Sequence, residues 1–287
     1  MAVLGLSPAV PAEQIDMART VASYIGIDLR EVKTTEGSDP TYVANDGEAC
    51  LACKTNLYST LRAVIGEARL TSEEEEEIGR EGQQPEGGPR RAVVLYNGTN
   101  ADDTSDPTRL GLIAASNFRV ESPLLLTTKS DVRRASKHLG LPNWDSAASP
   151  CLRSRLAMGV RATEGTLRAV DVAERWVREA LNLGRRDNMR VRFLAGRRAV
   201  VELDSTVLER LLSAEADTNT AAGDARGALE RMEFGEKLKD LGFDSYGVRA
   251  FRSGSVAAVK KKKGTATTTI EEVRVRNGDG LVMKNAS

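Results

Sequence analysis

Residues 3–32, VLGLSPAVPAEQIDMARTVASYIGIDLREV, set the fold class that we predict for the first half of the chain. Residues 3–6 are a short apolar run typical of a buried strand. Apolar side chains then recur at helical spacing up to Gly26, which ends the helix, and residues 27–32 predict the next strand. A strand, a helix and a second strand in this order favour a parallel sheet covered by helices, so the fold class is α/β.

The alternation of apolar strands and helices continues to residue 139. The predicted elements are a helix over 50–65, a buried strand over 92–96, a helix over 110–116, a strand over 120–126 and a helix over 128–139. Residues 71–91 are acidic from Glu73 to Glu77 and then rich in Pro and Gly. We interpret them as a flexible, solvated insertion.

After residue 160 the pattern changes to α+β. The predicted elements are a helix over 163–183, paired strands over 189–194 and 198–203, helices near 205–214 and 228–241, and a strand over 246–251. We therefore predict a nucleotide-binding domain over 1–157 and a smaller α+β domain for substrate binding and oligomerisation over 158–256. The tail, 257–287, is predicted to be disordered, although 270–275 could pair as a strand.

The composition restricts the classes of function. Lys and Arg number 41, as do Asp and Glu, so the net charge is zero, which disfavours a general nucleic-acid binder. No apolar stretch approaches the roughly 20 residues that span a bilayer, and the N-terminus lacks a secretory signal. Three cysteines are too few for a disulfide scaffold and indicate a reducing compartment. We expect a cytoplasmic protein with neither a membrane nor a nucleic-acid partner.

The three cysteines are candidates for metal chemistry. Cys50 and Cys53 form a Cys-x-x-Cys at the start of a predicted helix, where they share a face and the helix dipole favours thiolates. Together with Cys151, they could ligate an iron–sulfur cluster, although full ligation normally takes four cysteines. The alternatives are a thioredoxin-like pair, unrelated buried thiols, and structural zinc, for which the single histidine, His138, is poorly placed as a fourth ligand.

A polar loop and a pair of arginines are candidates for nucleotide and phosphate binding. Residues 97–103 follow a predicted strand, at the end where parallel sheets bind ligands, although a plain polar turn explains them equally well. Arg190 and Arg192 leave one face of a predicted strand and suit a phosphate. Glu174 and Glu202 could meet that face as acceptors or as metal ligands, and a solvated strand face is the alternative.

Several of these segments together resemble the LarE family of ATP-dependent sulfur transferases, which belongs to the PP-loop ATP pyrophosphatases. The similarity covers most of residues 3–255, in the same order. The segments that carry it are Gly98-Thr99-Asn100-Ala101-Asp102-Asp103, Pro142-x-Trp144-Asp145, Ala148-Ser149-Pro150-Cys151-Leu152-x-Ser154-Arg155, Arg190-Val191-Arg192-Phe193 and Phe251-Arg252-Ser253-Gly254.

The resemblance implies a fold like that of the adenine nucleotide alpha-hydrolases and a role in making the nickel-pincer nucleotide cofactor of lactate racemase. ATP, with Mg, would adenylate a pyridinium biscarboxylate mononucleotide, and sulfur would displace AMP. In some members one cysteine gives up its sulfur; in others three cysteines hold a [4Fe–4S] cluster whose extra sulfide is the donor. The three cysteines here match the second type, and Pro150 stands where the sacrificial cysteine would be.

The resemblance also implies roles for individual residues, and a homo-oligomer. The residues expected to bind the nucleotide are Gly98, Thr99, Asn100, Asp102 and Asp103, and those expected to bind the substrate phosphate are Lys54, Ser154, Arg155, Arg190 and Arg192. The cluster would be ligated by Cys50, Cys53 and Cys151, and a metal ion would be bound by Glu174 and Glu202. A further acidic position of the family is Arg210 here.

The phosphate-cradling loop of the family, Ser-Gly-Gly-x-Asp-Ser, does not occur in these 287 residues. The chain matches the family from its second strand onward, so we expect either an upstream segment, which leaves organelle targeting open, or a homologue that acts by binding only. We expect these residues alone to bind ATP poorly, because no phosphate cradle remains. A cluster-dependent tRNA thiolase is the other enzyme alternative, and it would need a basic surface.

Overall fold

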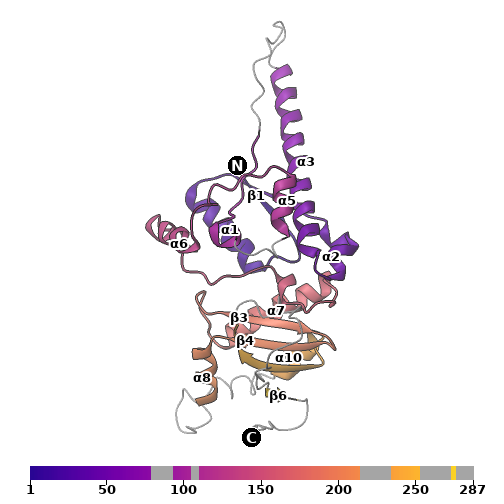
Figure 1. The fold of residues 1–287 in the computed structure, drawn as a ribbon, viewed down its shortest axis with the longest axis vertical. Coiled ribbons are helices and arrows are strands. Elements are labelled where there is room, and N and C mark those ends of the chain that lie inside the picture. Colours follow the sequence, from indigo (N-terminus) through magenta and orange to yellow (C-terminus); the bar gives the residue numbers. More distant parts are fainter. Residues whose placement is uncertain (79–92, 105–109, 214–233, 253–272, 276–287) are drawn as a thin grey trace. The chain divides into compact units, whose positions relative to one another are not determined.

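The computed structural model describes residues 1–78, 93–104, 110–213, 234–252 and 273–275 as a mixed α/β structure (Figure 1). The chain divides into two compact units. Unit 1 comprises Met1–Ser7, Ile15–Val43 and Gly47–Trp144, and unit 2 comprises Pro8–Gln14, Ala44–Asp46 and Asp145–Ser287. Among the described residues, no helix combines the length and the apolar character needed to cross a membrane.

Unit 1 contains the predicted strand–helix–strand. Strands β1 (Ala2–Leu6) and β2 (Leu29–Lys33) pair in parallel, and helix α1 (Ala12–Ile25) connects them. Gly26 ends α1 at a φ of 68°, a left-handed conformation that glycine adopts without strain. The parallel pair and its connecting helix confirm the prediction from the opening stretch.

Helices make up most of the rest of unit 1. They are the 3-10 turn η1 (Glu36–Ser38), α2 (Pro40–Ala44), α3 (Ala49–Ile78), α4 (Ala101–Thr104), α5 (Gly111–Asn117) and α6 (Lys129–His138). Tyr58 of α3 packs with Ala114 and Ala115 of α5 in a buried cluster. Helix α3 includes residues 71–78, which we expected outside it, because the glutamate run is a strong helix former and the next glycine after Gly66 is Gly79.

Two predicted buried strands of unit 1 are wrong. Residues 93–96 and 120–126 meet only at one parallel bridge, between Tyr96 and Glu121. The side chain of Tyr96 is 63% exposed. Pro123 has no N–H to donate to a neighbouring strand, and a turn begins there. A short apolar run therefore did not identify a buried strand at either place.

Unit 2 has the predicted α+β pattern. Its elements are η2 (Leu152–Arg155), α7 (Glu164–Ala180), β3 (Met189–Leu194), β4 (Arg198–Leu203), α8 (Ser205–Ser213), α10 (Phe234–Asp240), β5 (Ser245–Ala250) and β6 (Val273–Val275). The strands form one sheet in the order β3-β4-β5-β6, in which β4 and β5 are parallel and the other pairs are antiparallel. The strand predicted within 270–275 is thus present as β6.

The two faces of this sheet differ in polarity. Val191, Val201 and Val248 are register partners across β3, β4 and β5, and the first two are almost fully buried. Their sequence neighbours Arg190, Glu202 and Arg249 are also register partners. Because successive side chains of a strand point to opposite faces, the charged row lies on the face opposite the valines. We call that face the arginine face; Arg192, two residues after Arg190, belongs to it.

Helix α7 depends on a reciprocal cap at its N-terminus. The Thr163 hydroxyl accepts from the N–H of Thr166, at 3.2 Å, and the Thr166 hydroxyl accepts from the N–H of Thr163, at 3.0 Å. We predict that Thr163→Ala lowers the free energy of unfolding by about 1 kcal/mol, because helix α7 loses its N-terminal cap. Urea unfolding measures this change. Thr163→Ser, which keeps the hydroxyl, should unfold at nearly the wild-type urea concentration; an equal loss in both variants would contradict the role of the cap.

Candidate anion site on the arginine face

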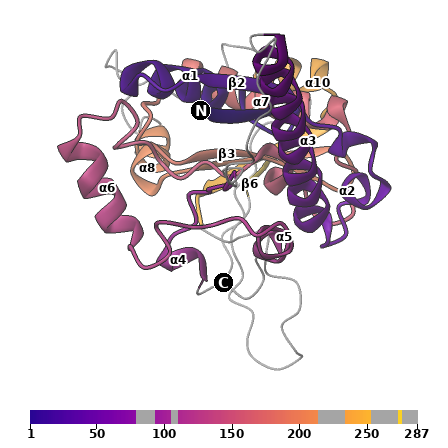
Figure 2. The ribbon, with the colours of Figure 1, turned by 90° about the horizontal axis from the view of Figure 1, so that it is seen from above.

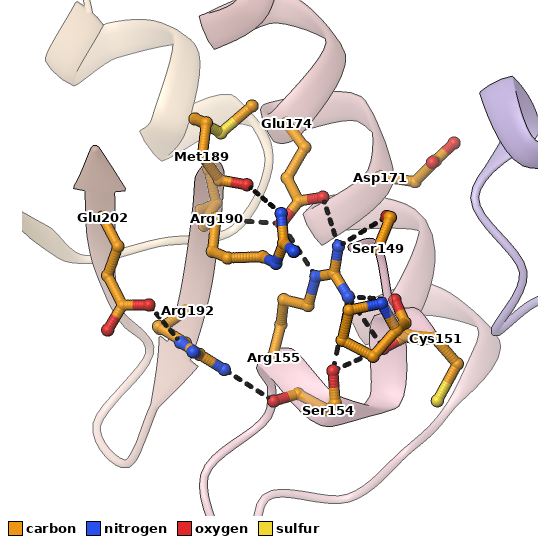
Figure 3. Close-up of polar contacts among 12 residues, drawn as sticks. Ser149, Cys151, Ser154, Arg155, Asp171, Glu174, Met189, Arg190, Arg192 and Glu202 are labelled. Carbon is orange, nitrogen blue, oxygen red and sulfur yellow. Dashed lines mark hydrogen bonds and ion pairs between the residues drawn. The ribbon is translucent and has the colours of Figure 1, made fainter. Parts of the chain in front are cut away.

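Arg155 is a fully buried charge of unit 2, with no exposed surface. Its guanidinium makes a two-pronged ion pair with Glu174 of α7, at 2.9 Å from Nε to Oε1 and 3.1 Å from Nη2 to Oε2 (Figure 3). Nη1 donates to the carbonyls of Pro150 and Cys151, and Nη2 also donates to the Ser149 hydroxyl. All five N–H groups of the side chain therefore have acceptors within unit 2.

The carboxylate of Glu174 also binds the edge of the sheet. Its Oε1 accepts from the backbone N–H of Val191 at 3.0 Å. Strand β3 is the edge strand of the sheet as described, and beyond it only the single bridge between Leu156 and Phe193 is present in the described residues, so this N–H pairs with a side chain instead of a strand. Glu174 thereby joins α7, the edge of β3 and the segment that contains Arg155. Arg155, predicted to hold a phosphate, instead has its donors engaged in fixing residues 149–155.

On the sheet itself, one carboxylate lies between two arginines. Glu202 has no exposed surface, and its Oε2 accepts from Nε of Arg192 at 2.8 Å. Its Oε1 accepts from Nε and Nη2 of Arg249, at 3.1 and 2.7 Å. Arg192 also donates from Nη1 to the Ser154 carbonyl at 2.7 Å. The sheet is thereby connected to the segment that carries Cys151 and Arg155.

Arg190 is buried, and the nearby carboxylate of Glu174 acts on it only through space. Arg190 is 4% exposed, and among the described residues no carboxylate forms an ion pair with it. Its Nη groups donate to the backbone carbonyls of Met189 and Ala148, and its guanidinium lies 5.5 Å from the centre of the Phe251 ring. Burial, and then the positive charge of Arg155, lower the pKa of Arg190 to about 10.

The charges around this site do not balance. Four guanidinium groups face two carboxylates in the contacts described, so two positive charges are in excess. Asp171 pairs with Arg175 rather than with one of these four arginines, and burial raises the pKa of the Asp171 carboxyl. A bound anion would supply the missing negative charge, and guanidinium groups suit phosphate and carboxylate ligands.

The described residues do not assemble a metal site from the predicted ligands. Every carboxylate oxygen of Glu174 and Glu202 accepts from a guanidinium, and those cations would repel a metal ion. In the part of the chain that is described, no three His, Cys, Asp or Glu side chains are grouped to hold a metal. The surroundings of Glu174 and Glu202 therefore do not fit a metal ion.

The three cysteines fall in different units. Cys50 and Cys53 lie in the first turn of α3, in unit 1, and all three thiols are partly exposed and not joined by disulfides. Cys151, in unit 2, precedes η2, and its carbonyl accepts from the N–H and hydroxyl of Ser154. Figure 3 shows its sulfur directed away from the Arg155 guanidinium. Lys54 is exposed on α3, and its side chain lies close to Gly111 of α5.

The predicted nucleotide loop is an ordered polar turn in unit 1. Asn100 caps α4, with its Oδ1 accepting from the N–H of Asp102 at 3.1 Å, and Asp103 accepts from the N–H of Asn100 at 3.2 Å. Asp102 accepts from the N–H of Lys129, so α4 lies close to one end of α6 (Figure 2). A side chain at Gly98 would meet no neighbour, and the N–H of Thr99 donates to Asn97. These amides and carboxylates hold the loop itself.

Arg249 is the member of the site that the sequence did not single out. Its position in the predicted strand 246–251, two residues before Phe251, was the feature of the sequence that could have indicated a place in the site. Its pairing with Glu202 depends on the register of β4 against β5, which sequence spacing does not give.

The chain is similar to two curated proteins. It is 33% identical to an uncharacterized protein of Synechocystis over 184 residues, which cover 62% of the chain and 59% of that protein. It is 25% identical to the pyridinium-3,5-bisthiocarboxylic acid mononucleotide synthase of Lactiplantibacillus plantarum over 179 residues, which cover 62% of the chain and 56% of that enzyme. The chain thus spans less than two thirds of either relative. No protein-family model matches it.

The buried pair of Arg155 and Glu174 yields a stability prediction. Arg155→Met should lower the free energy of unfolding by about 3–5 kcal/mol, because Glu174 would keep a largely buried charge without its partner. Urea unfolding measures the loss. Arg19→Met, which removes a solvent-exposed ion pair of unit 1, is the control and should change stability little. Equal effects of the two substitutions would contradict the structural role of Arg155.

Proposed function

We propose that the chain is a sulfur-transferase-like enzyme of the LarE type, and that its arginine face binds the phosphate of a mononucleotide. The observation that carries the proposal is Arg190, a buried cation beside Arg155 and Arg192 that forms no ion pair with a carboxylate of the described residues. The similarity to a bisthiocarboxylic acid mononucleotide synthase supports the class of substrate. A mononucleotide phosphate would supply the anion that this face lacks.

The proposed reaction has two balanced steps. A carboxylate oxygen of a pyridinium biscarboxylate mononucleotide attacks the α-phosphorus of ATP, and pyrophosphate leaves. A sulfur nucleophile then attacks the acyl carbon, and AMP leaves with the carboxylate oxygen, so that a thiocarboxylate forms. Adenylation matters because it replaces a poor leaving group with a good one, and sulfur is a strong nucleophile toward the activated carbon.

The residues of unit 2 would hold the substrate for this reaction. Arg190 and Arg192, on one face of β3, bind the phosphate and so keep the mononucleotide in one orientation. Arg155 acts indirectly, by fixing the segment 149–155, in which Ser154 and Cys151 lie. The sequence-based roles of Lys54 and of the 98–103 loop in phosphate and nucleotide binding stay predictions.

We propose that the three cysteines hold the group that donates the sulfur. Cys50, Cys53 and Cys151 would ligate a [4Fe–4S] cluster, which when bound would supply a sulfide as the nucleophile. The proposal is supported by the Cys-x-x-Cys on the first turn of α3 and by partly exposed, unbridged thiols. The alternative donor is the sulfur atom of one cysteine.

The phosphate-binding role predicts a loss of affinity on removing one guanidinium. Arg190→Leu should weaken the binding of nicotinate mononucleotide, a pyridinium carboxylate mononucleotide, by about 1.5–3 kcal/mol, the scale of a charge-assisted hydrogen bond. Isothermal titration calorimetry measures the affinity. Arg186→Leu removes an exposed arginine of unit 2 that pairs with Asp145, and it should bind like the wild type. Unchanged binding in Arg190→Leu would refute the assignment, and preferential binding of tRNA would favour a thiolase.

The cluster proposal predicts the iron content. Anaerobic reconstitution should give about four irons per chain with broad visible absorbance, and Cys151→Ala should lower that content. Ser149→Ala, which changes the same segment but leaves all thiols, should keep it. Full iron content in Cys151→Ala would contradict three-thiolate ligation. Loss of one sulfur atom from a cysteine after turnover, seen by mass spectrometry, would instead establish a sacrificial donor.

A further inference from the structure

The buried carboxylate of Glu202 forms ion pairs with two arginines and can fix the orientation of their guanidinium groups. Its side chain is completely buried, and its two oxygens accept from guanidinium groups on different strands, Arg192 on β3 and Arg249 on β5. A buried carboxylate needs such partners, because an unpaired buried charge is strongly unfavourable. The pairing in turn fixes both guanidinium groups, which belong to long side chains with many rotamers.

Arg249 lies at the more open end of this triad. Its side chain is 25% exposed, compared with 8% for Arg192 and 0% for Glu202. Both of its hydrogen bonds to Glu202 come from Nε and Nη2, so among the described residues Nη1 has no acceptor. Arg249 is also a neighbour of Arg190 in the charged row, with only Glu202 between them in the register.

We infer that Arg249 is a further ligand of the anion on the arginine face, and that Glu202 is the positioning residue that holds Arg249 and Arg192 toward it. The inference rests on the proposed function and adds a residue to its site. The ligand chemistry is a phosphate monoester. Nε and Nη2 of Arg249 are held by the carboxylate of Glu202, and the side chain is 25% exposed, so a phosphate oxygen can accept from its Nη1 donors.

The same pairing makes Glu202 poorly suited to bind a metal ion. Guanidinium nitrogens of both Arg192 and Arg249 occupy its two oxygens. A divalent cation would have to displace both arginines and then share the site with their charges. The same carboxylate cannot hold the arginines and coordinate a metal at the same time.

Calorimetry with nicotinate mononucleotide and with nicotinate riboside, which lacks the phosphate, tests the inference. Arg249→Gln should weaken mononucleotide binding on the order of tenfold, the loss of one charge-assisted hydrogen bond, and leave riboside binding unchanged. Arg249→Lys should recover part of the affinity, because the charge stays but the two-pronged contact with Glu202 is lost. Glu202→Gln should cause a similar loss, and the double variant should lose little more than either single one.

The controls separate this inference from the proposed function. Arg186→Gln, at an exposed site, should leave both affinities unchanged. Wild-type affinity in Arg249→Gln, together with a loss in Arg190→Leu, would overturn the inference and leave the proposed function standing. Unchanged binding in both variants would overturn both. Manganese binding that Glu202→Gln abolishes would also overturn the inference. If Glu202→Gln fails to fold, the two Arg249 variants still decide the question.

Discussion

A guanidinium group with no contact to water needs an acceptor for every N–H and a nearby negative charge, and Arg155 has both. Its carboxylate partner comes from α7, and its other acceptors come from the segment just before it in the sequence. The same carboxylate receives an N–H from the edge strand β3. One ion pair therefore sets how the helix, the edge of the sheet and the cysteine-bearing segment of unit 2 are joined, and the functional side chains are placed by that junction.

The distribution of charge follows from this arrangement. Glu174 pairs with Arg155 and the strand edge, and Glu202 pairs with arginines of β3 and β5, so among the described residues no carboxylate is left to form an ion pair with Arg190. A buried cation whose hydrogen bonds in the described part of the chain go to carbonyl oxygens is costly unless an anion joins it. The pKa of Arg190 is lowered for the same reason, since burial disfavours the charged form of the guanidinium. The site is thus prepared for a ligand with at least one negative charge.

Regular periodicity in the sequence predicted much of this fold. The helix over 163–183 and the two strands after it were recovered within a few residues because their apolar spacing is regular. The expected strand over 120–126 failed, since Pro123 interrupts it and its leucines lie in a turn. The spacing of Arg190 and Arg192 also correctly placed both on one strand face. The sequence could not predict which carboxylate pairs with which arginine, because the pairing depends on the register of three strands and on where α7 contacts the edge of the sheet.

The central claim is that the excess positive charge of unit 2 receives a phosphate. Isothermal titration calorimetry of the wild-type chain with nicotinate mononucleotide, repeated at rising salt concentration and compared with nicotinate riboside, tests it most directly. The account predicts measurable binding of the mononucleotide, weak or no binding of the riboside, and a modest effect of salt, because a buried ion pair is screened little. Equal affinity for the two compounds would contradict it, since the phosphate would then contribute nothing.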